Sequence, residues 1–280
     1  TDPLLFAVIF QGDLDIWLWV GRVISILCAA GILFIVGRQT FTRALFPIAL
    51  FSTLILVWDP YGFYMTHARY ALPDIPLALL VTIIMLRANA WLKNPRRRQL
   101  LLIAFLAGLA VSTKFNALLL LFPLLVLPLL AQTKITAYLR RYLIIAAGLG
   151  LGFFLGSPAF LFAPQVYHHD FLFEGHILFN TADALDHQWL LGALWQTDPL
   201  LTTLFILTLL FTLIRHSKED MLFQALAIPS YIFLTSLDKK TATYIIFLYQ
   251  LLVIKTTEFL DILRCPFPHF NHMLSEKILK

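Results

Sequence analysis

The stretch HARYALPDIPLALL, residues 67–80, decides how this chain is read, because it places Asp74 at the start of an apolar helix. Pro73 and Pro76 suit the beginning of that helix. An acid in a first helical turn is favoured by the helix dipole by about 0.3 to 1 kcal/mol, which would explain Asp74 without any function. The alternative is that Asp74 binds a metal ion or orients a substrate, while Arg69 offers its planar guanidinium to a phosphate.

The composition of the whole chain indicates a lipid environment. Of the 280 residues, 60% are hydrophobic and only 13% are charged, and the mean hydropathy is +0.81. A typical soluble domain contains about 25% charged residues. The net charge of +5 comes from basic residues scattered between apolar segments, so we expect no nucleic-acid partner. Two cysteines cannot form a disulfide framework, and no Cys/His zinc spacing occurs.

Apolar runs between charge clusters predict an all-α fold, a polytopic transmembrane helical bundle of about nine segments. We expect a single membrane domain over residues 1–280, with an external loop at 163–198 and a cytoplasmic tail at 259–280. The predicted segments are 16–37, 44–58, 74–91, 99–113, 117–131, 142–162, 199–215, 221–236 and 242–258.

The alternation of charge between successive loops predicts the orientation, because basic residues are retained on the cytoplasmic side of a membrane. One set of loops is basic and is expected to be cytoplasmic: it contains Arg38, Arg43, Arg87, Lys93, Arg96, Arg97, Arg98, Lys134, Arg140, Arg141, Arg215 and Lys218. The other loops hold most of the acids, including Asp59, Asp74 and Asp198, and are expected to be external. With the N-terminus on the external side, nine crossings place the basic C-terminal tail in the cytoplasm.

Glycines recur every four residues at Gly148, Gly152 and Gly156. This spacing puts three positions without a side chain on one helical face, which is typical of close helix packing in membranes. The local sequence lacks the GxGxxG spacing and the preceding strand of a dinucleotide loop. We therefore predict a packing role.

Two further basic positions stand out. Lys114 interrupts two apolar runs in GLAVSTKFNALLLLFP, where a lysine that snorkels from a helix end is the simpler interpretation. Lys239 and Lys240, followed by Tyr244, precede the last predicted span on the external side, against the usual charge bias. External lysines at that place favour a bound anion.

The long external loop contains a group of potential metal ligands at His168, His169, Asp170, Glu174 and His176. Asp170 and Glu174 would share a face if the segment were helical. Their spacing matches no specific zinc pattern, and polar loop residues are usually just solvated. Basic sites and an acid near the external membrane boundary nevertheless suggest an enzyme acting on a lipid-linked phosphate.

Several motifs, in the same order along the chain, resemble the GT-C superfamily of integral-membrane glycosyltransferases, in the branch of protein O-mannosyltransferases and aminoarabinose transferases. The resemblance covers nearly the whole chain. It rests on an Asp-Pro-Leu element at Asp2 followed by Arg22 in a GRxxS setting, on HARYALPDIPLALL with Asp74, on GLAVSTKFNALLLLFPLL with Lys114, and on KTATYIIFLY with Lys240, Thr243 and Tyr244.

The resemblance implies transfer of a hexosyl or pentosyl group from a polyprenyl-phosphate sugar to an acceptor hydroxyl, with inversion. It implies that Asp74 is catalytic and could bind a divalent ion such as Mg²⁺, Mn²⁺ or Zn²⁺. The residues expected to bind substrate are Arg69, Lys114, Lys240, Tyr244 and His67. Membrane lipids are the other expected partners, and the acceptor is not identified. The expected location is the plasma (inner) membrane, with the active face periplasmic or extracellular.

The family's catalytic acidic pair would lie upstream of Thr1, so we expect an N-terminally truncated chain. Asp13 and Asp15 could be proposed as substitutes, but a surface role suits their place before a helix better. Two other classes stay open. A transporter could also place polar residues near membrane helices, although no inverted repeat is visible. A non-catalytic lipid-binding homologue is the second alternative.

Overall fold

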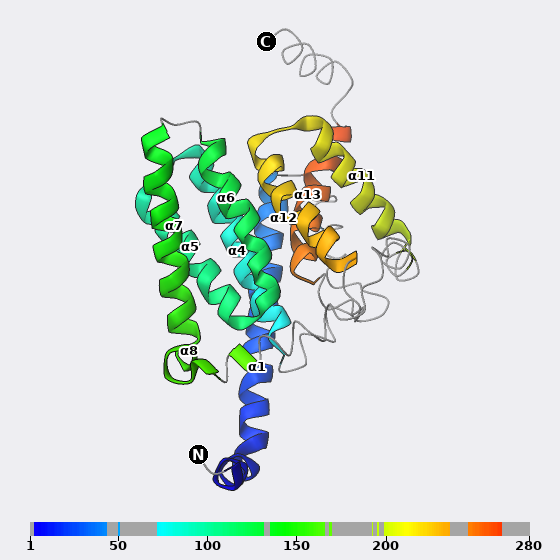
Figure 1. The fold of residues 1–280 in the computed structure, drawn as a ribbon. Helices are drawn as coiled ribbons and strands as arrows, with labels where there is room; N and C mark the ends of the chain where they lie inside the picture. Colours follow the sequence, from blue (N-terminus) through cyan, green and yellow to red (C-terminus); the bar gives the residue numbers. More distant parts are fainter. Residues whose placement is uncertain are drawn as a thin grey trace.

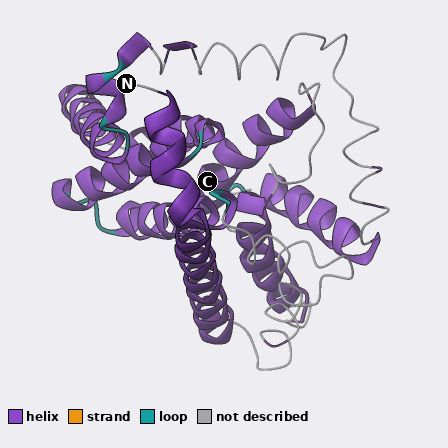
Figure 2. Cartoon of the chain, turned by 90° about the horizontal axis from the view of Figure 1, so that it is seen from below, coloured by secondary structure: helices purple, strands orange, loops and turns teal. Residues whose placement is uncertain are grey.

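The computed structural model describes residues 3–43, 50, 72–131, 135–165, 168–169, 192, 195, 199–235 and 246–264. Within these residues every regular element is a helix (Figure 2). The all-α prediction is therefore confirmed for the described part of the chain. The helices are α1 (Pro3–Arg43), α4 (Asp74–Lys93), α5 (Arg97–Thr113), the 3₁₀ helix η1 (Phe115–Leu120), α6 (Leu121–Leu130), α7 (Ile135–Gly156), α8 (Ala159–Phe162), α11 (Pro199–Arg215), α12 (Lys218–Thr235) and α13 (Ile246–Arg264).

The predicted segments 74–91 and 199–215 correspond closely to α4 and α11. The boundaries differ most at α1, which begins at Pro3 instead of residue 16, and next at α7, which begins at Ile135 instead of residue 142. Arg140 and Arg141 thus lie inside the helix, because arginine is a good helix former and its long side chain can carry its charge to the helix end. Apart from Leu50, the predicted segment 44–58 falls outside the described residues.

The helices form a bundle around α4 (Figure 1). The long α1 and the later helices α12 and α13 contact α4 on one side, and α5 contacts it on the other. Helix α7 packs along α5 at the edge of the bundle. We call the end that holds Lys93, Arg97 and Arg215 the basic end, and the end that holds Asp74 the acidic end.

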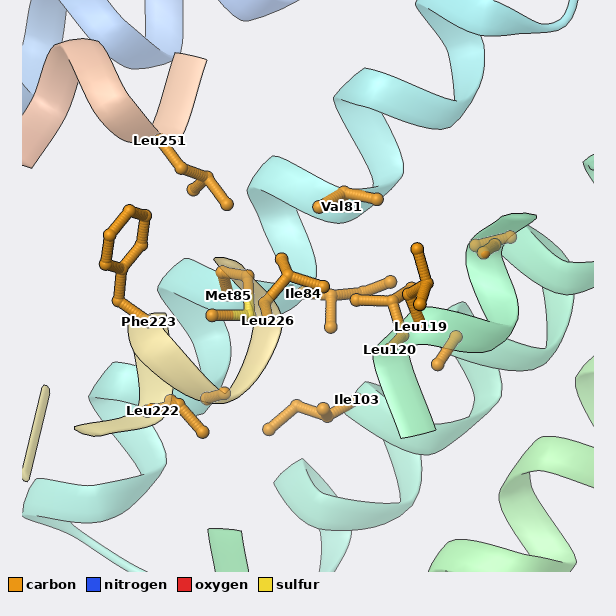
Figure 3. Close-up of a cluster of buried hydrophobic side chains, with 14 of the residues drawn as sticks. Val81, Ile84, Met85, Ile103, Leu119, Leu120, Leu222, Phe223, Leu226 and Leu251 are labelled. Carbon is orange, nitrogen blue, oxygen red and sulfur yellow. The ribbon is translucent and has the colours of Figure 1, made fainter. Parts of the chain in front are cut away.

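The core lies where α4 meets α5, η1 and α12 (Figure 3). Ile84 of α4, Ile103 of α5 and Leu226 of α12 are all at most 1% exposed. Burial of such side chains is worth about 1.5 to 3 kcal/mol each when the alternative is water. These contacts fix α4, and with it Asp74, relative to the neighbouring helices.

Large apolar side chains also cover the outer surface. Phe34 of α1, Leu139 of α7 and Ile214 of α11 are each more than 65% exposed. In the described part of the chain, three helical stretches are long and apolar enough to cross a bilayer: Leu18–Thr42, Asp74–Lys93 and Thr136–Gly156. Exposed apolar area of this extent is typical of a surface that faces lipid. The prediction of a membrane protein is confirmed.

The glycine periodicity of α7 is explained by its contact with α5. A Cβ atom at Gly152 would overlap the carbonyl oxygen of Phe105, and one at Gly148 would lie 2.7 Å from Cβ of Ala104. A Cβ atom at Gly108 of α5 would likewise overlap the carbonyl oxygen of Leu149 in α7. The two backbones approach as small residues allow in membrane helix pairs. Gly150 points elsewhere, and a Cβ atom there would meet nothing within 4 Å.

We expect Gly152→Ala to lower the free energy of unfolding by about 1 to 3 kcal/mol, because the added methyl group must push the backbone of α5 away. Gly150→Ala is the matched control on the same helix and should be neutral or slightly stabilising. Thermal unfolding of both variants in the same detergent checks the prediction. Equal stability of the two variants would contradict the packing seen here.

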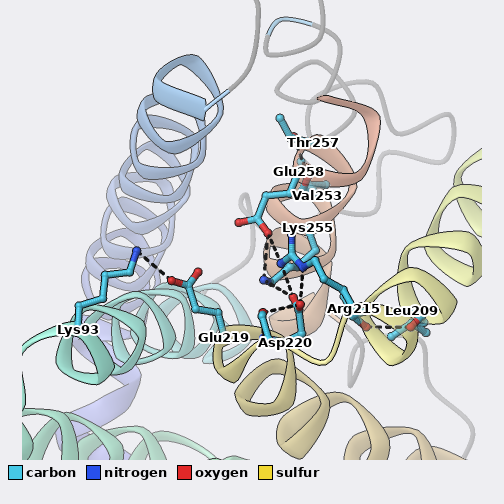
Figure 4. A network of polar contacts seen from close by, with 11 residues as sticks. Lys93, Leu209, Arg215, Glu219, Asp220, Val253, Lys255, Thr257 and Glu258 are labelled. Atoms are coloured by element: carbon cyan, nitrogen blue, oxygen red, sulfur yellow. Dashed lines mark hydrogen bonds and ion pairs between the residues drawn. The ribbon is translucent and has the colours of Figure 1, made fainter. Parts of the chain in front are cut away.

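A second constraint is a charged cluster at the basic end that ties α11, α12 and α13 together (Figure 4). Asp220 is fully buried and accepts hydrogen bonds from Arg215 Nη2 at 2.6 Å and from Lys255 Nζ at 2.9 Å. Glu258 Oε2 also accepts from Lys255, at 3.0 Å. Two positive and two negative groups therefore neutralise each other. No local pattern in the sequence predicts this cluster, because Asp220 and Lys255 lie 35 residues apart.

The ionised state of Asp220 depends on its partners. Asp220 lies in the first turn of α12, just before the apolar run that begins at Met221. Burial alone would raise the pKa of Asp220, but the hydrogen bond from Arg215 and the charge of Lys255 outweigh it and lower the pKa from 3.8 to about 2. Because the folded pKa is the lower one, this stabilisation is complete above about pH 4 and is lost as the pH falls towards 2.

Asp220→Asn should lower the free energy of unfolding by about 3 to 5 kcal/mol, because it leaves buried cations without their counter-charge. Glu219→Gln is the control: Glu219 pairs with Lys93 at 2.9 Å, but Lys93 is 70% exposed. An exposed pair contributes less than about 1 kcal/mol. Denaturation curves at neutral pH compare the two variants, and similar losses in both would refute a structural role for the buried cluster.

Candidate functional site

Asp74 begins α4 at the acidic end of the bundle, where Pro73 precedes it. The fixed φ of proline suits this position, and the carbonyl of Pro73 accepts the first helical hydrogen bond from Leu77. Despite its place at a helix terminus, Asp74 is only 5% exposed. A buried carboxylate is costly unless it is paired, so a partner is required.

Lys114 supplies that partner. Its backbone is extended, with φ −160° and ψ 134°, and it separates the end of α5 from the start of η1. This geometry confirms a helix break at Lys114. The ammonium Nζ lies 2.7 Å from Oδ1 of Asp74, across 40 residues of sequence. The side chain of Lys114 is still 26% exposed, so one part of the ion pair faces outward.

The ion pair brings together two of the predicted site residues. Snorkelling alone does not describe Lys114, because its charge is directed to a specific carboxylate. The carboxylate of Asp74 is likewise stabilised by the ammonium of Lys114 as well as by the helix dipole. The pair is neutral overall, and it holds the ammonium of Lys114 in one position at the acidic end of the bundle. Such a preorganised cation is suited to bind an anion.

Asn116, in the first turn of η1, is a feature that the sequence analysis missed. It is 7% exposed, and neither its Oδ1 nor its Nδ2 has a hydrogen-bond partner among the described residues. A buried unpaired amide costs about 1 to 3 kcal/mol for each unsatisfied group. Asn116 follows Lys114 by two residues, so this unpaired amide is close to the ion pair along the sequence. A ligand could satisfy these atoms, although the buried side chains of Asn89, Gln99 and Gln224 also contain polar atoms with no partner among the described residues.

The GRxxS element of α1 also reaches this end of the bundle. Ser25 is buried, and its hydroxyl lies 3.5 Å from the carbonyl oxygen of Leu72, two residues before Asp74. Arg22 is exposed, and its guanidinium stacks over Trp19 at 5.7 Å. Two motifs that are about 50 residues apart in sequence are therefore neighbours at the start of α4.

An apolar pocket of about 460 Å³ lies between α5, α7 and η1. Phe115, the residue after Lys114, forms part of its wall, together with Phe153 and Phe160. Gly108 of α5 and Gly150 of α7 also line it. Among the described residues of its lining, His168 is the only one with a polar side chain. Such a pocket is suited to a hydrocarbon chain.

Four predicted substrate-binding residues, Arg69, His67, Lys240 and Tyr244, lie outside the described residues. The same is true of Asp170, Glu174 and His176 in the long loop, whereas His168 and His169 are described. The roles predicted for all of these side chains stay predictions.

The described side chains offer little to a metal ion. In that part of the chain, no three histidine, cysteine, aspartate or glutamate side chains come together. The carboxylate of Asp74 is next to the ammonium of Lys114, whose charge would repel a divalent ion. The residues described near Asp74 do not by themselves form a metal site, and the metal ion stays a prediction.

A double-mutant cycle tests the ion pair. We expect Lys114→Ala to lower the free energy of unfolding by about 2 kcal/mol, because the buried Asp74 loses its counter-charge, although partial exposure of Lys114 reduces the cost. The double variant Asp74→Asn/Lys114→Ala should recover much of this loss. Chemical denaturation in detergent measures both single variants and the double variant. Strictly additive effects would show that the two residues do not interact.

Comparison with known proteins supports the fold. No protein-family model matches the chain, and no curated protein matches it in sequence. Among solved structures, the chain is similar to ArnT from Cupriavidus metallidurans, crystallised with bound undecaprenyl phosphate. The sequence identity is 17% and the TM-score 0.57, over 93% of this chain and 48% of that one. The chain thus spans about half the length of ArnT, and the two share a helical fold.

Proposed function

We propose that this chain is part of a membrane glycosyltransferase that transfers a sugar from a polyprenyl-phosphate donor to an acceptor hydroxyl on the external face. The observation on which the proposal rests is the ion pair between Asp74 and Lys114 at a helix break. The similarity of fold to ArnT, a protein whose crystals contain undecaprenyl phosphate, supports a polyprenyl phosphate as the ligand.

Lys114 is the group that we propose to bind the phosphate of the donor. Its side chain is 26% exposed, and Asp74 accepts a hydrogen bond from its ammonium. An ammonium that is already oriented loses little entropy when an anion binds. Asp74 is then a positioning residue for Lys114, a different role from the direct catalytic one expected from the family resemblance. Arg69 and Lys240 are proposed to add positive charge to the same phosphate.

The apolar pocket is proposed to accommodate part of the polyprenyl chain. Its wall contains Phe115, whose backbone continues directly from Lys114. A ligand with a phosphate at Lys114 could therefore place hydrocarbon against Phe115 and against Gly150 and Phe153 of α7. This arrangement combines a charged and an apolar region, as a lipid phosphate requires.

The proposed reaction exchanges one bond at the anomeric carbon of the sugar for another. The acceptor hydroxyl oxygen attacks the anomeric carbon, and the bond from that carbon to the phosphate oxygen breaks. The electron pair leaves with the polyprenyl phosphate, whose increased negative charge is stabilised by Lys114. A carboxylate acting as general base accepts the hydroxyl proton. Inversion follows from direct displacement.

Lys114→Ala should weaken binding of undecaprenyl phosphate by about tenfold or more, because one charge-assisted contact is lost. Asp74→Asn should weaken it less, since the ammonium stays but is no longer held in place. Lys114→Arg should restore part of the affinity. Titration of the full-length protein in detergent with undecaprenyl phosphate, with tryptophan fluorescence as the signal, measures the dissociation constant of each variant. Lys218→Ala, an exposed lysine at the basic end, is the charge-matched control.

Sugar transfer is assayed on the same variants with undecaprenyl-phosphate-linked mannose and aminoarabinose. Loss of transfer in Asp74→Asn and Lys240→Ala, with normal membrane insertion, supports the site. Normal turnover in both would disprove it. Binding of undecaprenyl phosphate without transfer from any such donor would favour the non-catalytic lipid-binding alternative, and substrate transport by reconstituted protein without sugar transfer would favour a transporter.

A further inference from the structure

A second pocket lies at the basic end of the bundle, between the beginnings of α5 and α7. Its volume is about 420 Å³. The lining includes three arginines, Arg97 of α5 and Arg140 and Arg141 of α7, together with Trp91 and Thr136. This basic pocket is at the opposite end of the bundle from Asp74, so it is separate from the site described above.

The charge of the basic pocket is not balanced by acids on the helices that form it. Between Asp74 and Asp170 the sequence contains no aspartate or glutamate. The ion pairs formed by described residues include none to Arg97 or Arg140. In the charged cluster around Asp220, by contrast, Arg215 and Lys255 each have a carboxylate partner. The guanidinium groups of Arg97 and Arg140 share this cavity without an ion pair among the described residues, so a bound anion is favoured there.

Arg141 is held in place by the buried ring of Trp91. The guanidinium stacks over this ring at 5.0 Å from its centre, and the indole Nε1 donates a hydrogen bond to the carbonyl oxygen of Arg96 at 3.0 Å. Trp91 is only 1% exposed, so the stacking surface is rigid. One wall of the basic pocket is therefore fixed before any ligand binds.

The start of α5 adds to the attraction for an anion. The side chain of its N-cap residue, Arg96, makes no capping hydrogen bond. The first backbone N–H groups of the helix therefore have no acceptor from that side chain. These groups carry partial positive charge and are suited to hydrogen-bond a phosphate oxygen.

The surroundings of the pocket favour a lipid over a free anion. Leu100 and Ile144 form apolar parts of its lining. Along α7, Leu139 is 67% exposed and Leu143 is 62% exposed, which provides an apolar surface beside Arg140. A soluble phosphate would make no use of this surface, whereas the acyl chains of a phospholipid could lie along it.

We propose that the basic pocket binds the phosphate headgroup of an anionic phospholipid, with the acyl chains against the outer face of α7. The charge alternation of the loops predicts that this end is cytoplasmic, where the leaflet is rich in anionic lipid. The phosphate contacts Arg97 and Arg140, and Arg141 forms the fixed side of the site. This proposal does not depend on the proposed sugar transfer.

Native mass spectrometry of the detergent-solubilised protein tests the proposal, with dioleoylphosphatidylglycerol as the probe. Arg97→Gln/Arg140→Gln should weaken binding of this lipid by about tenfold or more, because two basic contacts are removed. The matched control is Arg38→Gln/Arg98→Gln, which removes two exposed arginines from the same end without touching the pocket. This control should retain binding within about twofold of the unmodified protein.

Three results would overturn the proposal. Equal loss in the pocket and control variants would indicate general attraction to a basic surface. Equal binding of dioleoylphosphatidylcholine and dioleoylphosphatidylglycerol would exclude selection of an anionic lipid. Displacement of the lipid by millimolar inorganic phosphate alone would assign the pocket to a free anion. Arg140→Gln is measured as a second variant, and unchanged thermal unfolding in lipid-free detergent shows that both pocket variants are folded.

Discussion

The cost of an unpaired charge away from water is the constraint on which this structure depends. It can amount to several kcal/mol for each ion, far more than an exposed ion pair contributes. The buried charges of the described bundle meet this constraint by pairing across helices. Lys114 reaches Asp74 from the end of α5, and Lys255 and Arg215 reach Asp220 from α13 and α11. Each pair therefore also fixes how two or three helices lie relative to one another.

The two pairs have different surroundings. The cluster around Asp220 is neutral, and its carboxylate is fully buried, with Lys255 6% and Arg215 20% exposed. The pair of Asp74 and Lys114 is partly open, and it lies near an unpaired buried amide, Asn116, and an apolar pocket. An open ion pair beside unsatisfied polar atoms is the arrangement that ligand binding can complete. This difference is why we assign function to the acidic end.

Close helix packing supplies the second part of the architecture. In lipid, apolar side chains gain little from mutual burial, so helices associate through close contact of small residues. Gly108, Gly148 and Gly152 allow α5 and α7 to touch backbone to backbone. This contact supports α5 up to Thr113, directly before Lys114. The same two helices begin at the basic pocket, so one rigid pair connects the two proposed ligand sites.

The sequence by itself determined the membrane character, the helical class, most helix positions and the packing role of the glycines. These features follow from local composition and from periods of three to four residues, which a single stretch of chain contains. It also singled out Asp74 and Lys114 as unusual. Only the tertiary structure decided that these two are partners, that Lys255 is buried with Asp220, and that Arg97 lies with Arg140 around one cavity. Those facts depend on contacts between residues 35 to 43 positions apart, and no local pattern specifies which helix faces meet.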